Sequence, residues 1–359
     1  MFIRRTIPLA VIALLALAAC SLQAADEAQR FDFPNVGPYL VLRGDFHMHT
    51  IHSDGKLTTR ERVEESKRLG YDTIAITDHG KTVAYRVAKY VGDQLGMVVI
   101  RGHETGVNKK EHYVVLGVDS AYGPTDSHRW AEATGQETAF YQDQMENVAK
   151  HGGLIIWAHP HTGLREPTIW GAKQDILVGV ELKNDVVGEG WNTEKSHGTS
   201  WHPYAFDWAI QHNLAMLACT DAHGKRRDKP AVTLLFVTER SDKGVLDAIR
   251  CRRTVAWFDG MLWGRKELLS QLMGSMVTAS RSSDGKLALK NLGPVALKGA
   301  VEGSEGKSFE LAPYGEASVD APAGAATVRW ENVWCGLKEN VTTTYTYRSA
   351  VDISPGKVF

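Results

Sequence analysis

Short apolar runs alternate with amphipathic segments along most of the chain after residue 40, and this alternation restricts the fold more than any other feature. The run "YLVLRGD" at 39–45 is followed by "TTRERVEESKRLG" at 58–70 and then by "YDTIAIT" at 71–77. Runs that are apolar on both faces are typical of strands buried between helices, so we expect a parallel sheet covered by helices. About seven such units favour a closed (β/α) barrel over an open sheet.

Helices are expected at 58–70, 82–95, 136–151, 204–212 and 241–253. In the first of these, Thr58 and Glu61 have the spacing of a capping box, and Gly70 provides a C-terminal stop.

Nearly every expected strand ends in a histidine or a carboxylate. Because the carboxyl ends of barrel strands meet at one face, we expect these side chains to gather there. The 14 histidines would fall in helices and loops as well if they were placed without regard to strand ends. The strand-end residues are Asp45, His47, His49, Asp78, His79, His103, Glu104, His159, His161, Glu181, Asp221 and His223.

Each motif has an ordinary explanation when it is taken alone. Asp54 in "SDG" can form a turn, Thr77 or Asp78 can cap a helix, and Glu104 can be a surface acid. The spacing of His47 and His49, however, points both imidazoles to one side of a strand, as two ligands of one metal require. The joint occurrence of these residues at successive strand ends predicts a multinuclear metal site.

The motifs "HMH" with "SDG", "ITDHG", "GHE", "AHP" and "TDAH", in this order, resemble those of the PHP (polymerase and histidinol phosphatase) superfamily. The resemblance covers roughly 41–240. It implies a distorted seven-stranded (β/α) barrel, two or three metal ions at the strand ends, and hydrolysis of phosphate esters. The metal ligands that it implies are His47, His49, Asp54, His79, Glu104, His112, His159, Asp221 and His223, with Glu104 bridging two ions and His112 belonging to the trinuclear members.

Hydrolysis of a phosphate ester needs a nucleophile and a way to offset negative charge. Two bridged metal ions can supply both, by lowering the pKa of a shared water to give hydroxide and by holding the phosphoryl oxygens. A mixed set of histidines and carboxylates suits Zn, Mn or Fe. The expected cofactors are therefore two or three divalent transition metal ions, with Asp221, His223 and Glu104 as catalytic residues; Asp221 or His223 would pass a proton to the leaving group.

Cationic residues near the strand ends are candidates for substrate contacts, although structural ion pairs explain any one of them equally well. The candidates are Lys81, Arg101, Lys183 and Lys225, together with His161. His52 and His103 are expected beside the ligands rather than among them. Trp157, Trp170, Trp191, Trp201 and Trp208 can line a leaving-group pocket or pack in the core.

The chain changes character near residue 276. From there apolar and polar residues alternate with a period of two, and turn signals such as Asp284-Gly285 interrupt them. We expect a metal-dependent hydrolase domain at 38–275 and a small antiparallel β domain, a sandwich, at 276–359.

The first 24 residues are expected to be a signal peptide, because Arg4 and Arg5 precede an apolar run that ends in "LAAC". That ending resembles a lipobox, which would place a lipid anchor on Cys20; cleavage after Ala24 is the alternative. We therefore expect a periplasmic protein or an outer-membrane lipoprotein, attached to a membrane only through Cys20. Formal charge is −1, which gives no sign of a nucleic acid polymer as partner.

The expected function is an exported phosphodiesterase that acts on a small-molecule phosphate ester. The length, the signal and the C-terminal β region are similar to secreted PHP phosphodiesterases of the Sb-PDE type, which implies organophosphate diesters as substrates. A phosphomonoesterase acting on nucleotide or sugar phosphates is the first alternative. A non-catalytic metal- or ligand-binding lipoprotein on the same scaffold is the second.

Overall fold

The computed structural model describes residues 32–107, 111–124, 137–186, 201–226, 231–282, 284–303, 308–322 and 324–346. The expected signal peptide, its Cys20 and the indole of Trp191 lie outside these ranges. Among the described residues, no helix is long and apolar enough to cross a membrane.

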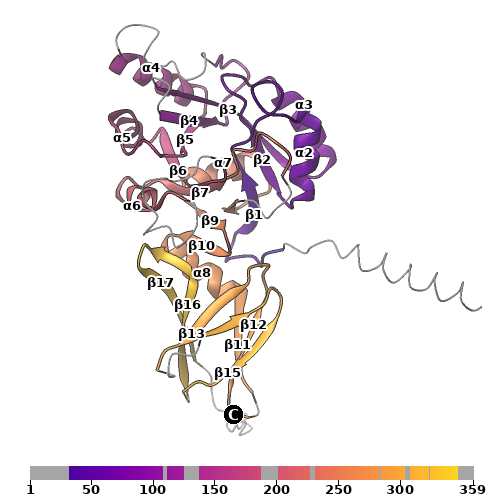
Figure 1. The fold of residues 1–359 in the computed structure, drawn as a ribbon, viewed down its shortest axis with the longest axis vertical. Coiled ribbons are helices and arrows are strands. Elements are labelled where there is room, and N and C mark those ends of the chain that lie inside the picture. Colours follow the sequence, from indigo (N-terminus) through magenta and orange to yellow (C-terminus); the bar gives the residue numbers. More distant parts are fainter. Residues whose placement is uncertain are drawn as a thin grey trace, which may run out of the picture.

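The upper part of the molecule in Figure 1 is a mixed α/β unit built on seven consecutive strands. Neighbouring strands in the sequence are also neighbours in the sheet, in the order β1-β2-β3-β4-β5-β6-β7. Their bounds are β1 Leu40–Asp45, β2 Thr73–Ile76, β3 Val98–Val107, β4 Glu111–Leu116, β5 Leu154–Ala158, β6 Leu177–Asn184 and β7 Ala215–Cys219.

The strands are only partly parallel. The pairs β1–β2, β2–β3, β5–β6 and β6–β7 are parallel, whereas β4 runs antiparallel to both β3 and β5. Val107 ends β3 and Glu111 begins β4, a separation far too short for the helical crossover that a parallel pair requires. The sheet predicted as parallel is therefore mixed at this point.

Two further strands bring the sheet back towards its start. β8 (Val232–Val237) pairs antiparallel with β1, and β9 (Thr254–Phe258) pairs antiparallel with β8. Side chains link this edge to β7: Met216 N donates to Thr254 Oγ1 at 3.1 Å, and Ala218 N donates to Thr233 Oγ1 at 3.0 Å. The sheet thus curves round so that its seventh strand lies against β8 and β9.

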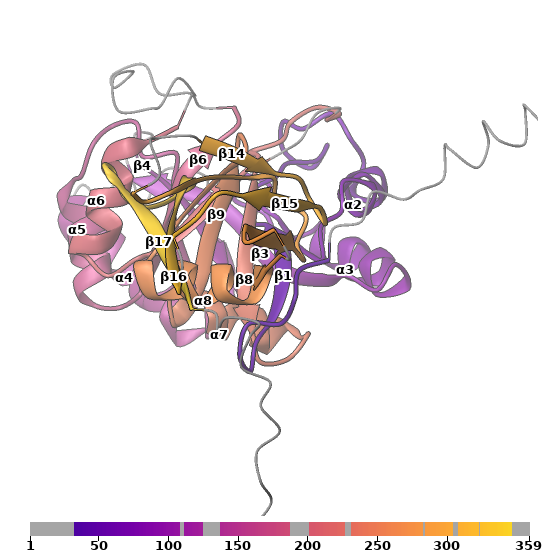
Figure 2. The ribbon, with the colours of Figure 1, turned by 90° about the horizontal axis from the view of Figure 1, so that it is seen from below.

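Helices surround these strands, with α2 and α3 on one side and α4, α5 and α6 on the other (Figure 2). The capping box at the start of α2 is confirmed, because Glu61 N donates to Thr58 Oγ1 at 3.3 Å and Thr58 N donates to Glu61 Oε2 at 2.8 Å. Gly70, just beyond the helix, has a φ of 88°, the left-handed conformation that ends many helices. The bounds are α2 Thr59–Arg68, α3 Tyr85–Gln94, α4 Glu137–Lys150, α5 Glu166–Lys173, α6 Pro203–Gln211 and α7 Asp242–Arg250; α5 has no counterpart among the expected helices.

The C-terminal part lies below in Figure 1 and is mostly antiparallel, as the two-residue period predicts. Its strands β11, β12 and β15 form a separate three-stranded sheet, but β16 pairs in parallel with β10, so the long sheet continues into this part. Leu272 of α8, Leu297 of β13 and Trp330 of β16 share one buried apolar cluster. The bounds are β10 Met261–Gly264, α8 Lys266–Met276, β11 Val277–Arg281, β12 Leu287–Asn291, β13 Leu297–Val301, β14 Ser308–Leu311, β15 Glu316–Val319, β16 Ala325–Gly336 and β17 Glu339–Thr346.

Candidate metal centre

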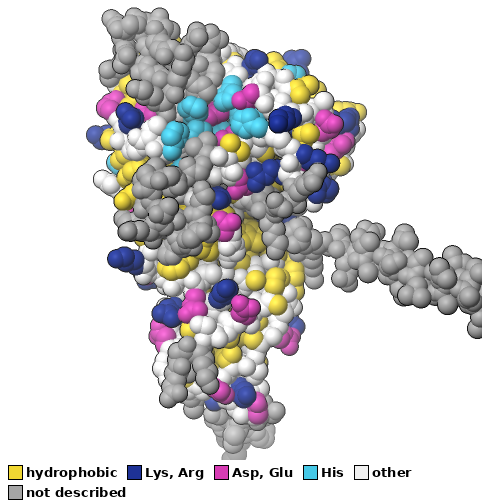
Figure 3. Space-filling model, in the orientation of Figure 1, with side chains coloured by type: hydrophobic (Ala, Val, Ile, Leu, Met, Phe, Trp, Pro, Cys, Tyr) yellow, Lys and Arg dark blue, Asp and Glu magenta, His cyan; other side chains and the backbone are white. Residues whose placement is uncertain are grey.

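The nine residues predicted as metal ligands come together at one edge of the sheet. Histidines gather there on the surface of the upper part (Figure 3). His47 and His49 follow β1, His79 follows β2, and His159 follows β5. His112 lies near the start of its strand rather than the end, yet it reaches the same edge because β4 runs antiparallel to its neighbours.

A central group contains two imidazoles and two carboxylates. Nε2 of His47 lies 3.3 Å from Glu104 Oε2 and 3.3 Å from Asp221 Oδ1. Nε2 of His49 lies 3.4 Å from Glu104 Oε2 and 3.0 Å from Asp221 Oδ1. All four side chains are buried. Two nitrogens and two oxygens therefore face a common point away from bulk water.

Glu104 connects this group to a second one through its other oxygen. Oε1 of Glu104 lies 2.9 Å from His112 Nδ1 and 3.3 Å from His159 Nε2. One carboxylate thus offers Oε2 to the central group and Oε1 to the second group. This is the arrangement expected of a residue that bridges two ions.

A third group lies on the solvent side of the central one. Oδ2 of Asp54 is 3.3 Å from His79 Nε2 and 3.2 Å from His223 Nε2, while Nδ1 of His49 is 3.6 Å from Asp54 Oδ1. The side chain of Asp54 is 53% exposed and that of His223 is 29% exposed, so this group opens to water. One ligand atom from each of His49, Asp54, His79 and His223 lies within 4.8 Å of the others. The same holds for three sets of three: His47, His49 and Glu104; His47, His159 and Asp221; and Glu104, His112 and His159.

The residues present fit divalent transition metal ions. Within the described chain, Nε2 of His47, Nε2 of His49 and Oδ1 of Asp221 are buried and take part in no hydrogen bond. Leaving such atoms without a partner costs about 1–3 kcal/mol each, which a coordinated cation would offset. His159 and Asp221 also have positive φ angles, 23° and 50°, a strained conformation typical of functional sites.

The electrostatics of the cluster favour a bound cation as well. Burial disfavours the ionised form of Glu104, but the neighbouring imidazoles, with His47 foremost, hold the pKa of this carboxyl well below its usual range. Burial likewise opposes charge on His47, yet the carboxylates of Asp221, Glu181 and Glu104 raise its pKa well above the usual value. Burial lowers the pKa of His49. The carboxylates therefore stay ionised and compete for positive charge.

Glu181 is a positioning residue that the strand pattern did not reveal as such. Its Oε1 lies 2.8 Å from His47 Nδ1, and its Oε2 accepts hydrogen bonds from His159 N at 2.7 Å and Asn184 Nδ2 at 3.0 Å. A proton on Nδ1 directed at Glu181 leaves Nε2 of His47 as the lone-pair donor, which fixes the tautomer needed for metal binding. The sequence placed Glu181 among the strand-end residues expected at this edge, but it gave no sign of the contact with His47.

Asp78 holds the loop that carries Asp54. Its Oδ1 accepts from Thr50 N at 2.7 Å and from Ser53 Oγ at 2.8 Å, and its Oδ2 accepts from Thr50 Oγ1 at 2.7 Å. This carboxylate is therefore occupied by the loop at 50–53. The sequence suggested Asp78 as a cap of the following helix, but the N-cap of α3 is Ala84, without a side-chain hydrogen bond.

The cationic residues predicted to contact substrate have partners inside the protein. Lys81 Nζ donates to His52 O at 2.6 Å, and an amino group of Arg101 donates to Asp119 O at 3.0 Å. Lys183 Nζ lies 3.5 Å from Asp259 Oδ2. Lys225 is described but takes part in none of the three groups. Their role in substrate binding stays a prediction.

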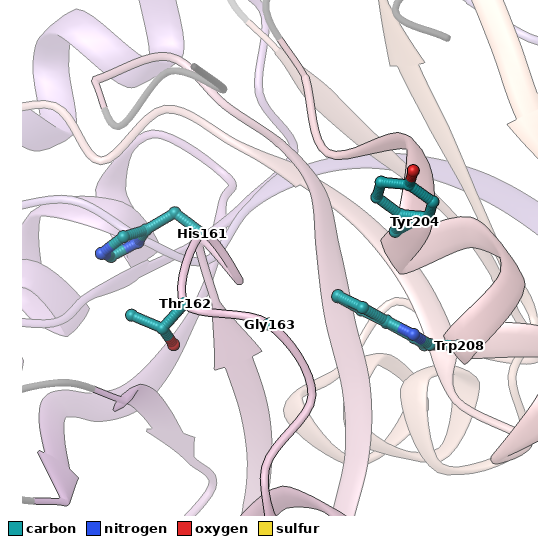
Figure 4. Close-up of a pocket in the computed structure, with 5 residues that line it drawn as sticks. All are labelled: His161, Thr162, Gly163, Tyr204 and Trp208. Carbon is teal, nitrogen blue, oxygen red and sulfur yellow. The ribbon is translucent and has the colours of Figure 1, made fainter. Parts of the chain in front are cut away.

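Two further histidines near the ligands differ from each other. The ring of His103 faces Tyr122, with Nε2 3.2 Å from the hydroxyl, and burial lowers its pKa to about 4, so it packs in the core as a neutral group. His161 donates from Nδ1 to His159 O at 2.7 Å and lines a cavity of about 370 Å³ together with Thr162, Gly163, Tyr204 and Trp208 (Figure 4).

Comparisons with known proteins point in the same direction as the geometry. Residues 45–164 match the PHP domain family. Over 80 residues the chain is 31% identical to a phosphoribosyl 1,2-cyclic phosphate 1,2-diphosphodiesterase of Eggerthella lenta, which is 21% of this chain and 30% of that protein. Over 144 residues it is 30% identical to a PolC-type DNA polymerase III of Staphylococcus epidermidis, 35% of this chain and 10% of the polymerase. The chain thus spans less than a third of the length of either relative.

One solved structure resembles nearly the whole molecule. It is a two-domain protein of Bacteroides vulgatus, described as containing a predicted PHP-like metal-dependent phosphoesterase. The TM-score is 0.73 at 20% identity, and the likeness covers 89% of this chain and 98% of that one. The chain therefore has the fold of this two-domain protein, and its residues 45–164, which carry most of the ligand cluster, match the PHP domain family.

Proposed function

We propose that the protein is a metal-dependent phosphodiesterase that hydrolyses small-molecule phosphate diesters. The observation that carries this proposal is Glu104, whose two oxygens face two different groups of ligands. The three groups around it would hold two or three divalent ions: His47, His49, Glu104 and Asp221 in the centre, Glu104, His112 and His159 behind, and Asp54, His79 and His223 on the solvent side.

Ions bound there would polarise the phosphoryl oxygens and make a coordinated water acidic enough to attack at neutral pH. Side chains of the protein would set the positions of the ions and their ligands. Glu104 holds the spacing between two positions, Glu181 orients His47, and Asp78 holds the loop of Asp54. Burial of the central group excludes bulk water, which strengthens every electrostatic contact to the phosphoryl group.

The proton for the leaving oxygen comes from the side of Asp221 and His223. Nδ1 of His223 donates to Asp221 O at 2.7 Å, which fixes the direction of the ring, and its side chain is partly open to solvent. Oδ2 of Asp221 is held by Asn184 Nδ2 at 3.3 Å, while its Oδ1 points into the central group. Of the two residues, His223 is the one that can carry a proton where an ester enters from the open face. Burial opposes charge on Asp221, but the neighbouring imidazoles of His47 and His49 lower its pKa and keep the carboxylate ionised.

Diesters are preferred over monoesters on two grounds. One relative is named as a diphosphodiesterase of a cyclic phosphate, and the length, the expected signal and the C-terminal β region resemble those of secreted phosphodiesterases that act on organophosphate diesters. Export through the segment at 1–24, with or without a lipid anchor on Cys20, stays a prediction from the sequence.

Metal analysis of the purified full chain, combined with rates on a panel of diesters and monoesters with Mn, Zn or Fe supplied, tests the proposal. Glu104→Gln is expected to reduce kcat/KM for diesters by about 100- to 1,000-fold, because the amide offers no second anionic oxygen. Glu111→Gln is a matched control: this buried carboxyl is hydrogen-bonded to Thr168, and burial raises its pKa to about 7.

Undiminished diester hydrolysis by metal-loaded Glu104→Gln would refute the bridging role. Faster turnover of monoesters by the wild type would favour a phosphomonoesterase. A wild type that binds metal and hydrolyses no phosphate ester would show a binding protein on this scaffold.

A further inference from the structure

A cavity lies next to the metal centre, because the loop that forms one of its walls directly follows a metal-ligand candidate. The cavity is lined by His161, Thr162, Gly163, Tyr204 and Trp208. The loop at 160–163 follows His159 directly, and the imidazole of His159 belongs to the group around Glu104 Oε1. The rings of His159 and His161 are 5.4 Å apart. An ester whose phosphoryl group lies at the cluster can therefore extend one arm into this cavity.

The described residues of the lining carry no acidic or basic side chain other than the imidazole of His161. No carboxylate, lysine or arginine side chain among the described residues lines the cavity. A second phosphate or an ammonium group would therefore gain no carboxylate, lysine or arginine partner from these five residues. The polar side-chain atoms on the lining belong to His161, Thr162 and Tyr204, which are too few to satisfy the several hydroxyls of a sugar.

The lining is instead aromatic on the side of α6. Figure 4 shows the side chain of Trp208 extending from the helix towards the loop at 161–163, with Tyr204 beside it. The ring planes of these two residues are inclined by 27°, with centroids 6.2 Å apart. Trp157, which is fully buried, stacks on Trp208 with centroids 5.2 Å apart. Trp208 is thus held in place by the core.

A rigid aromatic group at the wall of an uncharged cavity is suited to a flat ring, which it can contact without losing side-chain freedom. The opposite wall gives room for one: Gly163 has a φ of 79°, and an added Cβ there would meet no atom within 4 Å. The size also suits a small ligand, since cavities for such ligands begin at about 300 Å³.

We propose that this cavity is the leaving-group subsite of the phosphodiesterase, and that it takes an ester arm bearing a flat, uncharged aromatic ring packed against Trp208. The inference rests on the proposed function for the position of the phosphoryl group. Trp208 and Tyr204 would distinguish an ester arm with a ring from one without, and they would not contact the phosphoryl group.

Equilibrium binding tests the subsite without relying on turnover. The probes are phenylphosphonate and methylphosphonate, titrated calorimetrically into the full chain loaded with Mn²⁺. Trp208→Leu keeps an apolar side chain but removes the ring and part of its volume, and we expect it to weaken phenylphosphonate binding about tenfold while methylphosphonate binding changes less than twofold. Trp170→Leu is the control, because Trp170 packs edge-on against Tyr141 and does not line the cavity.

Kinetics supply the second arm. In Trp208→Leu, kcat/KM for an aryl diester is expected to fall about tenfold, and that for a dialkyl ester less than twofold. Each substrate is compared with itself, so differences in intrinsic reactivity cancel. Repeating the titration with a nucleoside monophosphate in place of phenylphosphonate distinguishes a ring attached directly to phosphorus from a nucleobase. Weaker binding of either ligand by Trp208→Leu supports the subsite.

Equal losses for ring-bearing and ringless ligands, or no loss for either, would overturn the inference. So would a wild type that binds the two phosphonates equally. A protein that binds phenylphosphonate through Trp208 but hydrolyses no ester would leave the subsite standing and remove the proposed function. Unfolding curves and metal content of each variant separate these outcomes from a damaged fold.

Discussion

Two parts of the long sheet, the upper part with β3 and β6 and the C-terminal part with β13 and β16, carry different kinds of buried side chain. In β3 and β6 the buried residues include Glu104 and Glu181, whereas in β13 and β16 they include Leu297, Val328 and Trp330. The apolar strands gain free energy from burial, about 25 cal/mol for each Å² removed from water. The carboxylates lose free energy on burial unless hydrogen bonds or cations compensate them.

Hydrogen bonds do not fully compensate the buried polar groups around Glu104. Glu181 has several hydrogen-bond partners, but the central atoms of His47, His49 and Asp221 have none among the described residues. The apolar region needs no ion for its burial to be favourable, so we expect the two regions to respond differently to metal removal and to core substitutions. Experiments that separate the two regions test this view.

Removing the ions is expected to have the largest effect. Treatment with a strong chelator followed by dialysis should lower phosphodiester hydrolysis by roughly 1,000-fold or more, because imidazoles and carboxylates alone provide no Lewis acid. Rates before and after addition of Mn or Zn, with metal analysis of both samples, give the measurement. Full activity in a sample shown to be free of metal would contradict the view that the region around Glu104 needs ions.

A cavity in the apolar region is expected to change stability and leave the chemistry intact. Leu297→Ala removes a fully buried side chain of β13 and should lower the free energy of unfolding by about 2–5 kcal/mol. Denaturant unfolding gives this value, and kcat/KM of the folded protein should change less than twofold. Leu297→Met, which roughly conserves volume, is the control.

A parallel fall in metal content for Leu297→Ala would show that the two regions are not independent. That result would agree with the pairing of β10 and β16, through which the sheet is continuous.

Loss of the charge on Glu181 should weaken metal binding without removing a ligand. Glu181→Gln is expected to reduce metal affinity about 10- to 100-fold, since carboxylates that orient a coordinating histidine have effects of this size. Competition with a chromophoric chelator measures the affinity, and Glu111→Gln again serves as control. An unchanged affinity would assign Glu181 a purely structural role, as support for His159 N and Asn184.

Local patterns predicted much of the fold. The capping box of Thr58 and Glu61 lies where the sequence places it, because capping depends on residues only three positions apart. The mixed direction of the strands was not predicted from the sequence. The antiparallel direction of β4 follows from the short separation between Val107 and Glu111, which leaves no room for the helix that the alternation of strands and helices predicts. Local spacing does not state which strand a run will pair with.

The candidate site divides in the same way. His47, His49 and Asp221 were predicted from motifs at strand ends, and the structure brings them together. Glu181 acts on His47 from 134 residues away, a relation that no local pattern contains. The partners of Lys81 and Lys183 include His52 and Asp259, which are 29 and 76 positions away, so charge and position along the sequence could not show these contacts.

A carboxylate outside both regions is expected to give the smallest effect, and it shows how an ordinary ion pair differs from the cluster. Burial alone would raise the pKa of Asp72, but hydrogen bonds and charge from Arg43, together with the charge of Arg240, lower it. A carboxyl with a lower pKa in the folded state stabilises the protein above its unfolded pKa of about 3.9, and this stability is lost as pH falls through the folded pKa. Asp72→Asn should therefore lower the free energy of unfolding by about 1 kcal/mol at pH 7 and by less near pH 3. Denaturant unfolding at both pH values measures the loss of unfolding free energy. This loss should be the same with and without metal, because Asp72 belongs to none of the ligand groups. A loss that depends on metal would mean that the cluster and this ion pair are coupled through β1.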